Sequence, residues 1–393
     1  MNLFVAALLA AVAPQVDQKR IDDALRKGVA FLKTAKTPGV GFAKITDSYE
    51  IVLLALVHAG VSEGDPRFQE LFKRMMDEPL ERTYKVVLQA MILEELDRAK
   101  HQGKIAQCAQ FLVDNQCANG QWSYGEPSAF VKEVPPSRDV STSAKPKVRD
   151  FGDPGREKPK VTRKVPVKKL KAGPEAGDNS NSQYAALGLR ACHDAGIVLP
   201  REVVELARKW WIECQHPADG EKGAVATDGL ASGPPRGWCY SRKDVCAKKH
   251  QPYAGMTAGG VGAVAICDHI LDIDWKKDPA VKSGLAWLVS RWSVTENAGP
   301  IEFDSSPKEE LYYSLYALER AGMLLGLQKM GRHDWYAEGA EAILAAQKSD
   351  GSWNDGAAQR GNSTWDTCYA ILFLKKATRG LDVASEDVAK PRK

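Results

Sequence analysis

The stretches Gln116-Cys-Ala-Asn-Gly-Gln-Trp122 and Gln347-Lys-Ser-Asp-Gly-Ser-Trp353 share one spacing: a Gln, a Gly four residues later, and a Trp two residues after the Gly. Each copy lies between two segments of helical periodicity. A Gln near a helix C-terminus can hydrogen-bond the backbone of a neighbouring turn. The Gly allows the chain to reverse with positive φ, and the Trp packs over the connection between the two helices. The two copies predict a repeat protein. A third stretch, Gln215 to Gly220, departs in spacing and reaches a Trp only at Trp238.

A period of 3.6 residues predicts six pairs of helices along the chain. The first members are expected at 18–33, 66–77, 103–116, 201–215, 279–292 and 334–347. The second members are expected at 47–60, 82–99, 181–195, 256–271, 309–325 and 364–377. The second members are apolar on nearly all sides and belong inside, whereas the first members carry charge on one face and belong outside. The sequence therefore predicts an all-α fold, an α/α toroid of six inner and six outer helices.

Three of the second members share an ending, Ala followed by Gly60, Gly196 or Gly322. A glycine just after the last helical residue takes the left-handed conformation without a steric cost. We therefore expect all three glycines to terminate their helices.

The two ends of the 393-residue chain are expected to lie outside the repeats. Residues 1–15 contain an apolar run too short to span a bilayer and are predicted to be a signal peptide, although no Lys or Arg precedes the run and Pro14 follows it. Export to the periplasm or the extracellular space is expected, and a cytoplasmic location otherwise. Repeats are assigned to 16–130 and 178–380, and a disordered tail to 381–393.

A basic, proline-rich insertion is expected at 131–177. Between residues 131 and 171 it has thirteen Lys plus Arg and five Asp plus Glu, so this segment accounts for the net charge of +4 of the whole chain. Its low apolar content predicts disorder. It is expected to be a solvated linker, or to contact an anionic surface or partner. No nucleic-acid partner and no transmembrane segment are predicted.

The eight cysteines include no C-x-x-C pair, so neither a zinc ribbon nor a disulfide framework is required. Five residues in or beside one loop have the chemistry of metal ligands without a recognised spacing, and they are Cys214, His216, Cys239, Cys246 and His250. A disulfide between Cys239 and Cys246 is the alternative, favoured if the protein is exported.

The repeats resemble those of the terpene cyclase and protein prenyltransferase superfamily, which includes the squalene cyclases. The resemblance covers about 18–377, apart from the insertion and the loop at 217–254. It implies an α/α toroid with Gln-Gly-Trp signatures and a cavity inside the inner ring, bordered by the starts of the inner helices. It also implies an apolar or isoprenoid ligand.

The residues that carry the chemistry of that superfamily are changed in this chain. In Trp365-Asp-Thr-Cys-Tyr369, Asp366 stands where prenyltransferases have a zinc-binding His, and Tyr312 in Glu310-Leu-Tyr-Tyr-Ser314 takes the place of the zinc-binding Cys. Of the cyclase acid motif Asp-x-Asp-Asp, Ser363-Thr-Trp-Asp366 keeps only the last Asp. We therefore predict no metal site and no cofactor.

Candidate site residues are taken from the starts of the inner helices. The candidate acids are Asp366, Asp178 and Asp47. The candidate binding residues are Asn179, Asn181, Gln183, Tyr49, Tyr84, Tyr184, Thr257, Tyr312 and Trp365. Asp, Asn and Thr at such positions also cap helices, which is their commoner role. Asp178 and its neighbouring amides exceed what one cap needs, so they could orient a polar ligand.

Three functions remain open from the sequence. The first is a squalene cyclase-like or prenyltransferase-like enzyme that acts on an isoprenoid or another long apolar substrate. The second is a non-catalytic exported binding or scaffold protein for a lipid, glycan or peptide. The third is a carbohydrate-active α/α barrel, which needs two facing carboxylates from a pool of Asp47, Glu50, Asp178 and Asp366. Whether any reaction is catalysed is not decided by the sequence.

Overall fold

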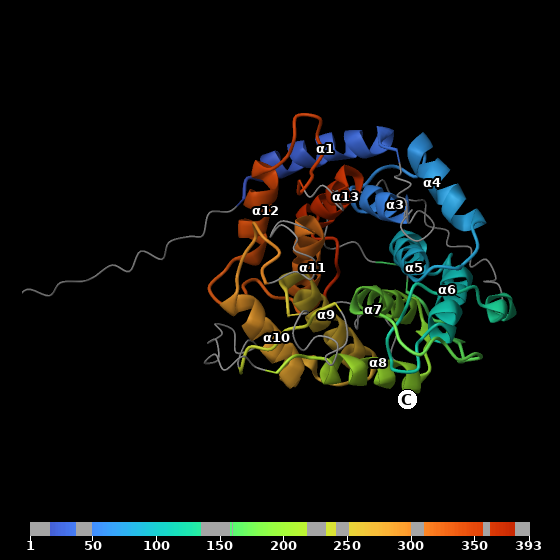
Figure 1. Ribbon diagram of the computed structural model, residues 1–393. Helices are drawn as coiled ribbons and strands as arrows, with labels where there is room; N and C mark the ends of the chain where they lie inside the picture. Colours follow the sequence, from blue (N-terminus) through green and yellow to red (C-terminus); the bar gives the residue numbers. More distant parts are fainter. Residues whose placement is uncertain are drawn as a thin grey trace, which may run out of the picture.

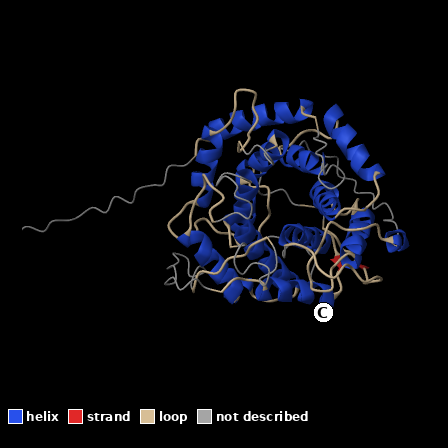
Figure 2. Ribbon diagram, viewed as in Figure 1, coloured by secondary structure: helices blue, strands red, loops and turns tan. Residues whose placement is uncertain are grey.

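The computed structural model describes residues 16–36, 49–134, 158, 160–217, 233–240, 251–299, 310–356 and 362–381. These residues form twelve α-helices, two short 3₁₀ helices (η1, Ala129–Glu133, and η2, Trp275–Lys277) and one pair of short strands. The all-α expectation is confirmed, as Figure 2 shows.

The helices alternate along the chain between an amphipathic and a deeply buried type. The amphipathic helices are α1 (Gln18–Thr34), α4 (Pro66–Asp77), α6 (Gln102–Asp114), α8 (Arg201–Glu213), α10 (Pro279–Ser290) and α12 (Trp335–Ala345). The buried helices are α3 (Tyr49–His58), α5 (Thr83–Asp97), α7 (Asn179–Asp194), α9 (Ala254–Ile270), α11 (Leu311–Leu324) and α13 (Ser363–Leu374). Both sets match the ranges expected from periodicity to within a few residues.

The buried helices contact one another in a closed series. The contacts run from α3 to α5, α7, α9, α11 and α13, and α13 contacts α3 again. Figure 1 shows the amphipathic helices outside this series. The first and last of these outer helices, α1 and α12, also contact each other. The two ends of the helical array therefore meet.

Aspartates begin several outer helices. The carboxylates of Asp17, Asp65, Asp278 and Asp334 accept hydrogen bonds from the first-turn amides of α1, α4, α10 and α12. Pro66 and Pro279 follow two of these caps, where a missing N–H is harmless and φ is already helical. Local sequence thus sets where these helices start.

Each Trp of the repeated signature is bound in the same way. Its indole N–H donates to the carbonyl of the residue four positions before the signature Gln. The three bonds run from Trp122 to Leu112, from Trp238 to Trp211 and from Trp353 to Ile343, at 2.8, 2.7 and 2.7 Å. The backbone N–H of each Trp donates to a hydroxyl on the next inner helix, namely Ser182, Thr257 or Thr367. Each Trp therefore joins an outer helix to the inner helix that follows it.

The signature Gln side chains connect neighbouring outer helices. Their amides donate to the backbone carbonyls of Val203 in α8, Ala280 in α10 and Ala24 in α1, from Gln116, Gln215 and Gln347 at 2.7, 3.0 and 2.9 Å. The last of these bonds links the end of the array to its beginning. The Gln215 copy makes the same bonds although a longer loop separates its Gln from Trp238.

The signature glycines permit a close approach to the next outer helix. Gly120 and Gly351 have φ of 94° and 87°. A Cβ atom on Gly120 would lie 2.4 Å from the Leu206 carbonyl oxygen, and one on Gly351 would lie 2.5 Å from that of Lys27. Any other residue would have to displace the backbone of the neighbouring helix.

The shared Ala-Gly endings have two structural roles. Gly60 and Gly196 follow α3 and α7 with φ of 75° and 79°, as expected for helix-terminating glycines. The expectation for Gly322 is wrong, because α11 continues to Leu324 and the left-handed residue is Gly326. A Cβ on Gly322 would lie 2.5 Å from the indole of Trp335, so this glycine makes room for an outer helix.

Part of the expected insertion is packed onto the helices. Strand β1 (Val165–Pro166) pairs in parallel with β2 (Ile197–Val198), and Gln110 of α6 donates to the Lys168 carbonyl. Val161 and Val167 are buried, which explains how this stretch offsets its ordering entropy. Residues 135–157 and 159 lie outside the described part of the chain, as do residues 1–15 and 382–393. Disorder in the insertion and tail, and the signal peptide, stay predictions. Within the described ranges, no helix is long and apolar enough to cross a membrane.

The bond from Gln347 to α1 is testable by substitution. Gln347→Ala removes the hydrogen bonds to the carbonyls of Ala24 and Gly351. We expect it to lower the free energy of unfolding by roughly 1–3 kcal/mol, measured by urea denaturation. Gln328→Ala, at an exposed position after α11, is the control and should change it by less than about 0.5 kcal/mol. Equal effects of the two substitutions would contradict a role for Gln347 in closing the array.

Candidate functional site

Four tyrosines from four inner helices meet, three in the first halves of α5, α7 and α11 and one in the middle of α13. The ring centroids of Tyr84 and Tyr184 lie 4.4 Å apart, those of Tyr184 and Tyr313 6.2 Å, and those of Tyr313 and Tyr369 5.6 Å. Tyr184 is buried, and the other three are partly exposed. We call these four residues the tyrosine cluster. Their partly exposed rings provide aromatic surface that a ligand can contact.

Polar side chains fix the orientation of the tyrosine cluster. The Gln183 amide donates to the Tyr313 hydroxyl at 2.5 Å, and Arg320 donates to the Gln183 carbonyl oxygen at 2.9 Å. The Arg320 guanidinium lies over the rings of Tyr316 and Tyr184, 4.3 and 5.2 Å from their centroids. A buried cation is thus held by aromatic faces and by an amide oxygen.

Three carboxyl-bearing residues are joined near the starts of α11 and α13. Asp366, in the first turn of α13, is 6% exposed and accepts a hydrogen bond from the Asp355 backbone N–H at 3.1 Å. The Asp355 carboxylate in turn accepts one from the Glu310 backbone N–H at 2.9 Å. We call Glu310, Asp355 and Asp366 the carboxyl cluster. It brings together the starts of two helices and the loop that follows Trp353.

Burial and a neighbouring negative charge keep Asp366 protonated at neutral pH. Burial raises the pKa of Asp366 to about 8, and the nearby Asp355 carboxylate adds to the rise. A carboxylic acid that is neutral at pH 7 can donate a proton. Asp366 therefore has the protonation state of a general acid.

The carboxyl cluster lies close to the tyrosine cluster. Burial raises the pKa of Tyr313, and the Glu310 carboxylate adds to that rise as it does to the rise at Asp366. Glu310 also has φ of 59° and ψ of 27°, a left-handed conformation that is uncommon for a residue with a side chain. Such strain concentrates at functional sites.

Most of the predicted polar residues are used within the fold. Asp178 caps α7, and its carboxylate accepts bonds from the backbone and the side chain of Asn181 at 2.7 and 2.8 Å. Asn179 is fully buried, and its side chain bonds Gln121, Trp210 and the Cys239 carbonyl. Of the predicted amides, Gln183 is the one that contacts the tyrosine cluster. Asp47 lies outside the described residues.

The remaining predicted residues lie at different places around the ring. Thr257 is buried and accepts the Trp238 backbone bond, whereas Tyr49 is buried under the Arg74 guanidinium. Tyr312 is buried beside Asp366, and Trp365 is partly exposed on α13. Their roles in binding stay predictions.

Glu50, another member of the predicted carboxylate pool, is paired with a cation of the neighbouring inner helix α5. It is 2% exposed and lies 3.7 Å from the Lys85 ammonium, and burial raises its pKa to about 7. Lys85 also pairs with Glu78. This group joins α3, α4 and α5.

Sequence reasoning missed the role of Asp355 and of Arg320. Asp355 follows Trp353 by two residues, so a search of the loops that continue the Gln-Gly-Trp signature would have found it. Arg320 lies inside an otherwise apolar helix, which marks it as a buried charge in need of partners.

The cysteine-rich loop offers less ligand chemistry than its composition indicates. Cys239 is disulfide-bonded, and the other six described cysteines are free and buried. Its sulfur lies 3.2 Å from Nε2 of His216. Since a disulfide sulfur is not a thiolate, Cys239 is a poor metal ligand in this state. Cys246 and His250 lie outside the described residues.

Comparisons with known proteins find similarity to solved structures. No protein-family model matches the chain, and no curated protein matches it. Among solved structures, the chain is similar to one from Salmonella enterica subsp. enterica serovar Paratyphi A, described as a possible member of the GH105 family. The two share 9% sequence identity with a TM-score of 0.50, over 95% of this chain and 99% of that chain. At this identity, the similarity establishes a shared fold.

This comparison corrects the interpretation as a squalene cyclase-like or prenyltransferase-like protein with an isoprenoid ligand. The structural similarity is to a possible member of the GH105 family, and no family model supports the terpene cyclase assignment. The physical reason is that the Gln, Gly and Trp of the signature bind backbone groups of neighbouring helices. They determine how hairpins pack and carry no information about the substrate.

The raised pKa of Asp366 predicts a pH-dependent effect on stability. The folded-state pKa of about 8 exceeds the ordinary value of 3.8, so ionisation of Asp366 increasingly destabilises the fold as the pH rises between these values. Asp366→Asn keeps a neutral side chain. We expect its stabilising effect relative to wild type to be roughly 2–4 kcal/mol larger at pH 9 than at pH 5, measured by urea denaturation.

Asp350→Asn, in the same loop as Asp355, is the matched control for this measurement. Bonds from Ser352 lower the pKa of Asp350 below its ordinary value of 3.8, so Asp350 is ionised at both pH values and its substitution should destabilise the fold equally at pH 5 and pH 9. An Asp366→Asn effect that does not change between the two pH values would show that Asp366 is ionised in the fold.

Proposed function

We propose that this chain is a carbohydrate-active α/α toroid of six inner and six outer helices, with Asp366 as its general acid. The observation that carries the proposal is the buried carboxyl of Asp366, whose pKa is about 8, directly beside a second carboxyl residue, Asp355. Glycoside hydrolysis needs one carboxylic acid to protonate the leaving oxygen and a second carboxylate to act as base or nucleophile.

The architecture supports the toroid part of the proposal. The inner helices contact one another in a closed series, and α12 contacts α1 outside it. The similarity to a possible GH105 member covers nearly the whole of both chains, which fits a shared ring architecture. That similarity supports the fold, whereas the chemistry rests on the residues of this chain.

In the proposed reaction, protonated Asp366 donates its proton to the glycosidic oxygen as the bond to the anomeric carbon breaks. Asp355 then either removes a proton from the attacking water and later releases it to solvent, or attacks the anomeric carbon to form a glycosyl ester that water hydrolyses. The proton lost by Asp366 is regained from water at the end of the cycle. The neutral acid costs little to bury, while the negative Asp355 beside it keeps the proton on Asp366 until a substrate takes it.

The tyrosine cluster supports a sugar as the substrate. The apolar faces of sugar rings pack against aromatic rings, and Tyr84, Tyr313 and Tyr369 are partly exposed. Ser180 and Gln183 lie among these rings and bond their hydroxyls. Aromatic faces with a few fixed polar groups are typical of small-molecule sites.

The proposal is tested by assaying the purified full-length protein against a panel of neutral and acidic oligosaccharides at pH 7, with reducing ends as the readout. Where wild type cleaves a substrate, we expect Asp366→Asn and Asp355→Asn each to lower kcat by about 10²–10⁴-fold. Activity should fall above about pH 8, where Asp366 ionises.

Asp350→Asn serves again as the matched control and should retain wild-type kcat, because Asp350 is exposed and bonds only within its own turn. Cleavage that survives Asp366→Asn would contradict the assignment of the acid. Binding of oligosaccharides without cleavage by wild type would contradict the enzymatic role and favour a glycan-binding protein.

A further inference from the structure

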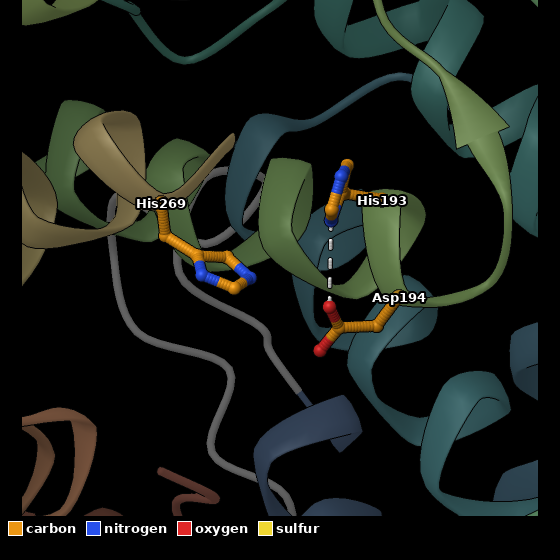
Figure 3. Close-up of side chains that lie close together, drawn as sticks. All are labelled: His193, Asp194 and His269. Atoms are coloured by element: carbon orange, nitrogen blue, oxygen red, sulfur yellow. Dashed lines mark ion pairs between the residues drawn. The ribbon is translucent and has the colours of Figure 1, made fainter. Parts of the chain in front are cut away.

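A second group of titratable side chains lies at the other ends of the inner helices. His193 and Asp194 come from the last turn of α7, and His269 comes from the last turn of α9. Figure 3 shows the three side chains pointing toward one another. One ligand atom from each residue lies within 4.8 Å of those of the other two.

This group is separated from the tyrosine and carboxyl clusters by the length of the inner helices. Ser180, which bonds the tyrosine cluster, is near the start of α7, and Asp194 is its last residue. A rise of 1.5 Å per residue places the two about 21 Å apart along the helix. The end of α5 lies beside this group too, because Arg98 donates a hydrogen bond to the Asp194 carbonyl at 3.3 Å.

We propose that His193, Asp194 and His269 form a binding site for a single zinc-class divalent cation. Two imidazoles and a carboxylate are a recognised ligand set for zinc in sites that keep a fourth position open for water or substrate. Calcium and magnesium prefer all-oxygen surroundings, so the two histidines favour a transition-type ion.

Two ligand atoms at this site lack hydrogen bonds. Asp194 is 6% exposed, and neither its Oδ1 nor Nδ1 of His193 has a hydrogen-bond partner among the described residues. These two atoms lie 3.6 Å apart. That distance is too long for a hydrogen bond but suits two ligands of one ion, since ligand bonds of 2.0–2.2 Å put ligand atoms about 3–4 Å apart. Buried polar atoms without partners are rare and require an explanation.

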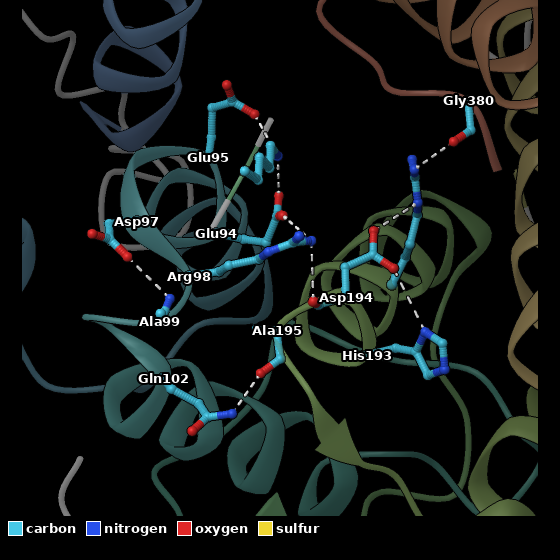
Figure 4. Close-up of polar contacts among 12 residues, drawn as sticks. Glu94, Glu95, Asp97, Arg98, Ala99, Gln102, His193, Asp194, Ala195 and Gly380 are labelled. Atoms are coloured by element: carbon cyan, nitrogen blue, oxygen red, sulfur yellow. Dashed lines mark hydrogen bonds and ion pairs between the residues drawn. The ribbon is translucent and has the colours of Figure 1, made fainter. Parts of the chain in front are cut away.

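The surroundings orient the carboxylate and keep it ionised. Arg190 pairs with the second oxygen of Asp194, Oδ2, at 3.4 Å, and donates to the Gly380 carbonyl at 3.3 Å. Figure 4 shows Asp194 between His193 and Arg98, which donates to the Asp194 carbonyl. Burial would raise the pKa of Asp194, but Arg190, His193 and His269 together outweigh burial, and the pKa lies below its usual range. Oδ1 is left directed toward the histidines.

The two histidines are placed to act as neutral ligands. Burial lowers the pKa of His269, which favours the unprotonated imidazole that binds metal. Both α7 and α9 end at the site, and the negative ends of their dipoles favour a cation. Arg190 opposes the ion, so we expect weaker binding than at a closed four-ligand site.

The test is zinc binding by the full-length protein after it has been stripped with EDTA and dialysed. Isothermal titration with ZnCl₂ should give one ion per chain, and Co²⁺ should give the visible absorption of a four- or five-coordinate ion. His193→Gln and His269→Gln should each weaken zinc binding at least tenfold and remove the Co²⁺ absorption. Zinc should also raise Tm in wild type but not in these variants.

His101→Gln is the matched control, a partly buried histidine before α6 whose ring is tilted against that of Phe72, and it should bind zinc as wild type does. Asp194→Asn removes the carboxylate that pairs with Arg190 and could prevent folding. The histidine variants then decide whether zinc binds at this site. Stripped wild-type protein that binds no zinc, or binding that survives both histidine substitutions, would overturn the proposal and leave a histidine–aspartate ion pair.

Discussion

The structure depends on two hydrogen bonds that recur at each signature. The Trp indole donates to a carbonyl of its own hairpin, and the Gln amide donates to a carbonyl of the next outer helix. The three copies repeat the same offset of four residues between the Gln and the Trp acceptor. The hydrogen bond from Gln347 to the Ala24 carbonyl makes the same contact between the last and the first outer helix. Each bond is worth only about 1 kcal/mol, but its geometry sets how one hairpin is placed against the next.

Closing the array in this way gives the bundle of inner helices two ends with different chemistry. We call the end where these helices start the first pole, and the end where they finish the second pole. The first halves of α5, α7 and α11 and the middle of α13 gather the tyrosine cluster, and the carboxyl cluster lies near the starts of α11 and α13. The ends of α7 and α9 gather the two histidines and Asp194. A protonated carboxyl is stabilised at the first pole by burial, whereas helix dipoles and an ionised carboxylate favour a cation at the second. The proposed reaction and the proposed metal site are therefore physically separate.

Local sequence predicted the helices and the turns, but it did not predict which side chains meet. The Gln-Gly-Trp spacing requires only contacts with adjacent helices, and the period of 3.6 residues identified the helix pairs correctly. Asp366 was found because it opens a helix, yet its partner Asp355 comes from a loop whose path depends on α11. His193 and His269 are ordinary helix-end residues until the ring brings α7 beside α9. The packing of Val161 and Val167 was likewise not predictable, because these side chains are buried only once the chain has folded.

The central claim, that Asp366 is the acid of a carbohydrate site beside the tyrosine cluster, is tested most directly by a crystal structure. Crystals of Asp366→Asn would be soaked with an oligosaccharide that the wild type cleaves or binds. The account predicts a sugar ring against Tyr84, Tyr313 or Tyr369, with a glycosidic oxygen about 3 Å from the residue 366 amide. A sugar bound away from these tyrosines, with no atom near residue 366, would contradict it.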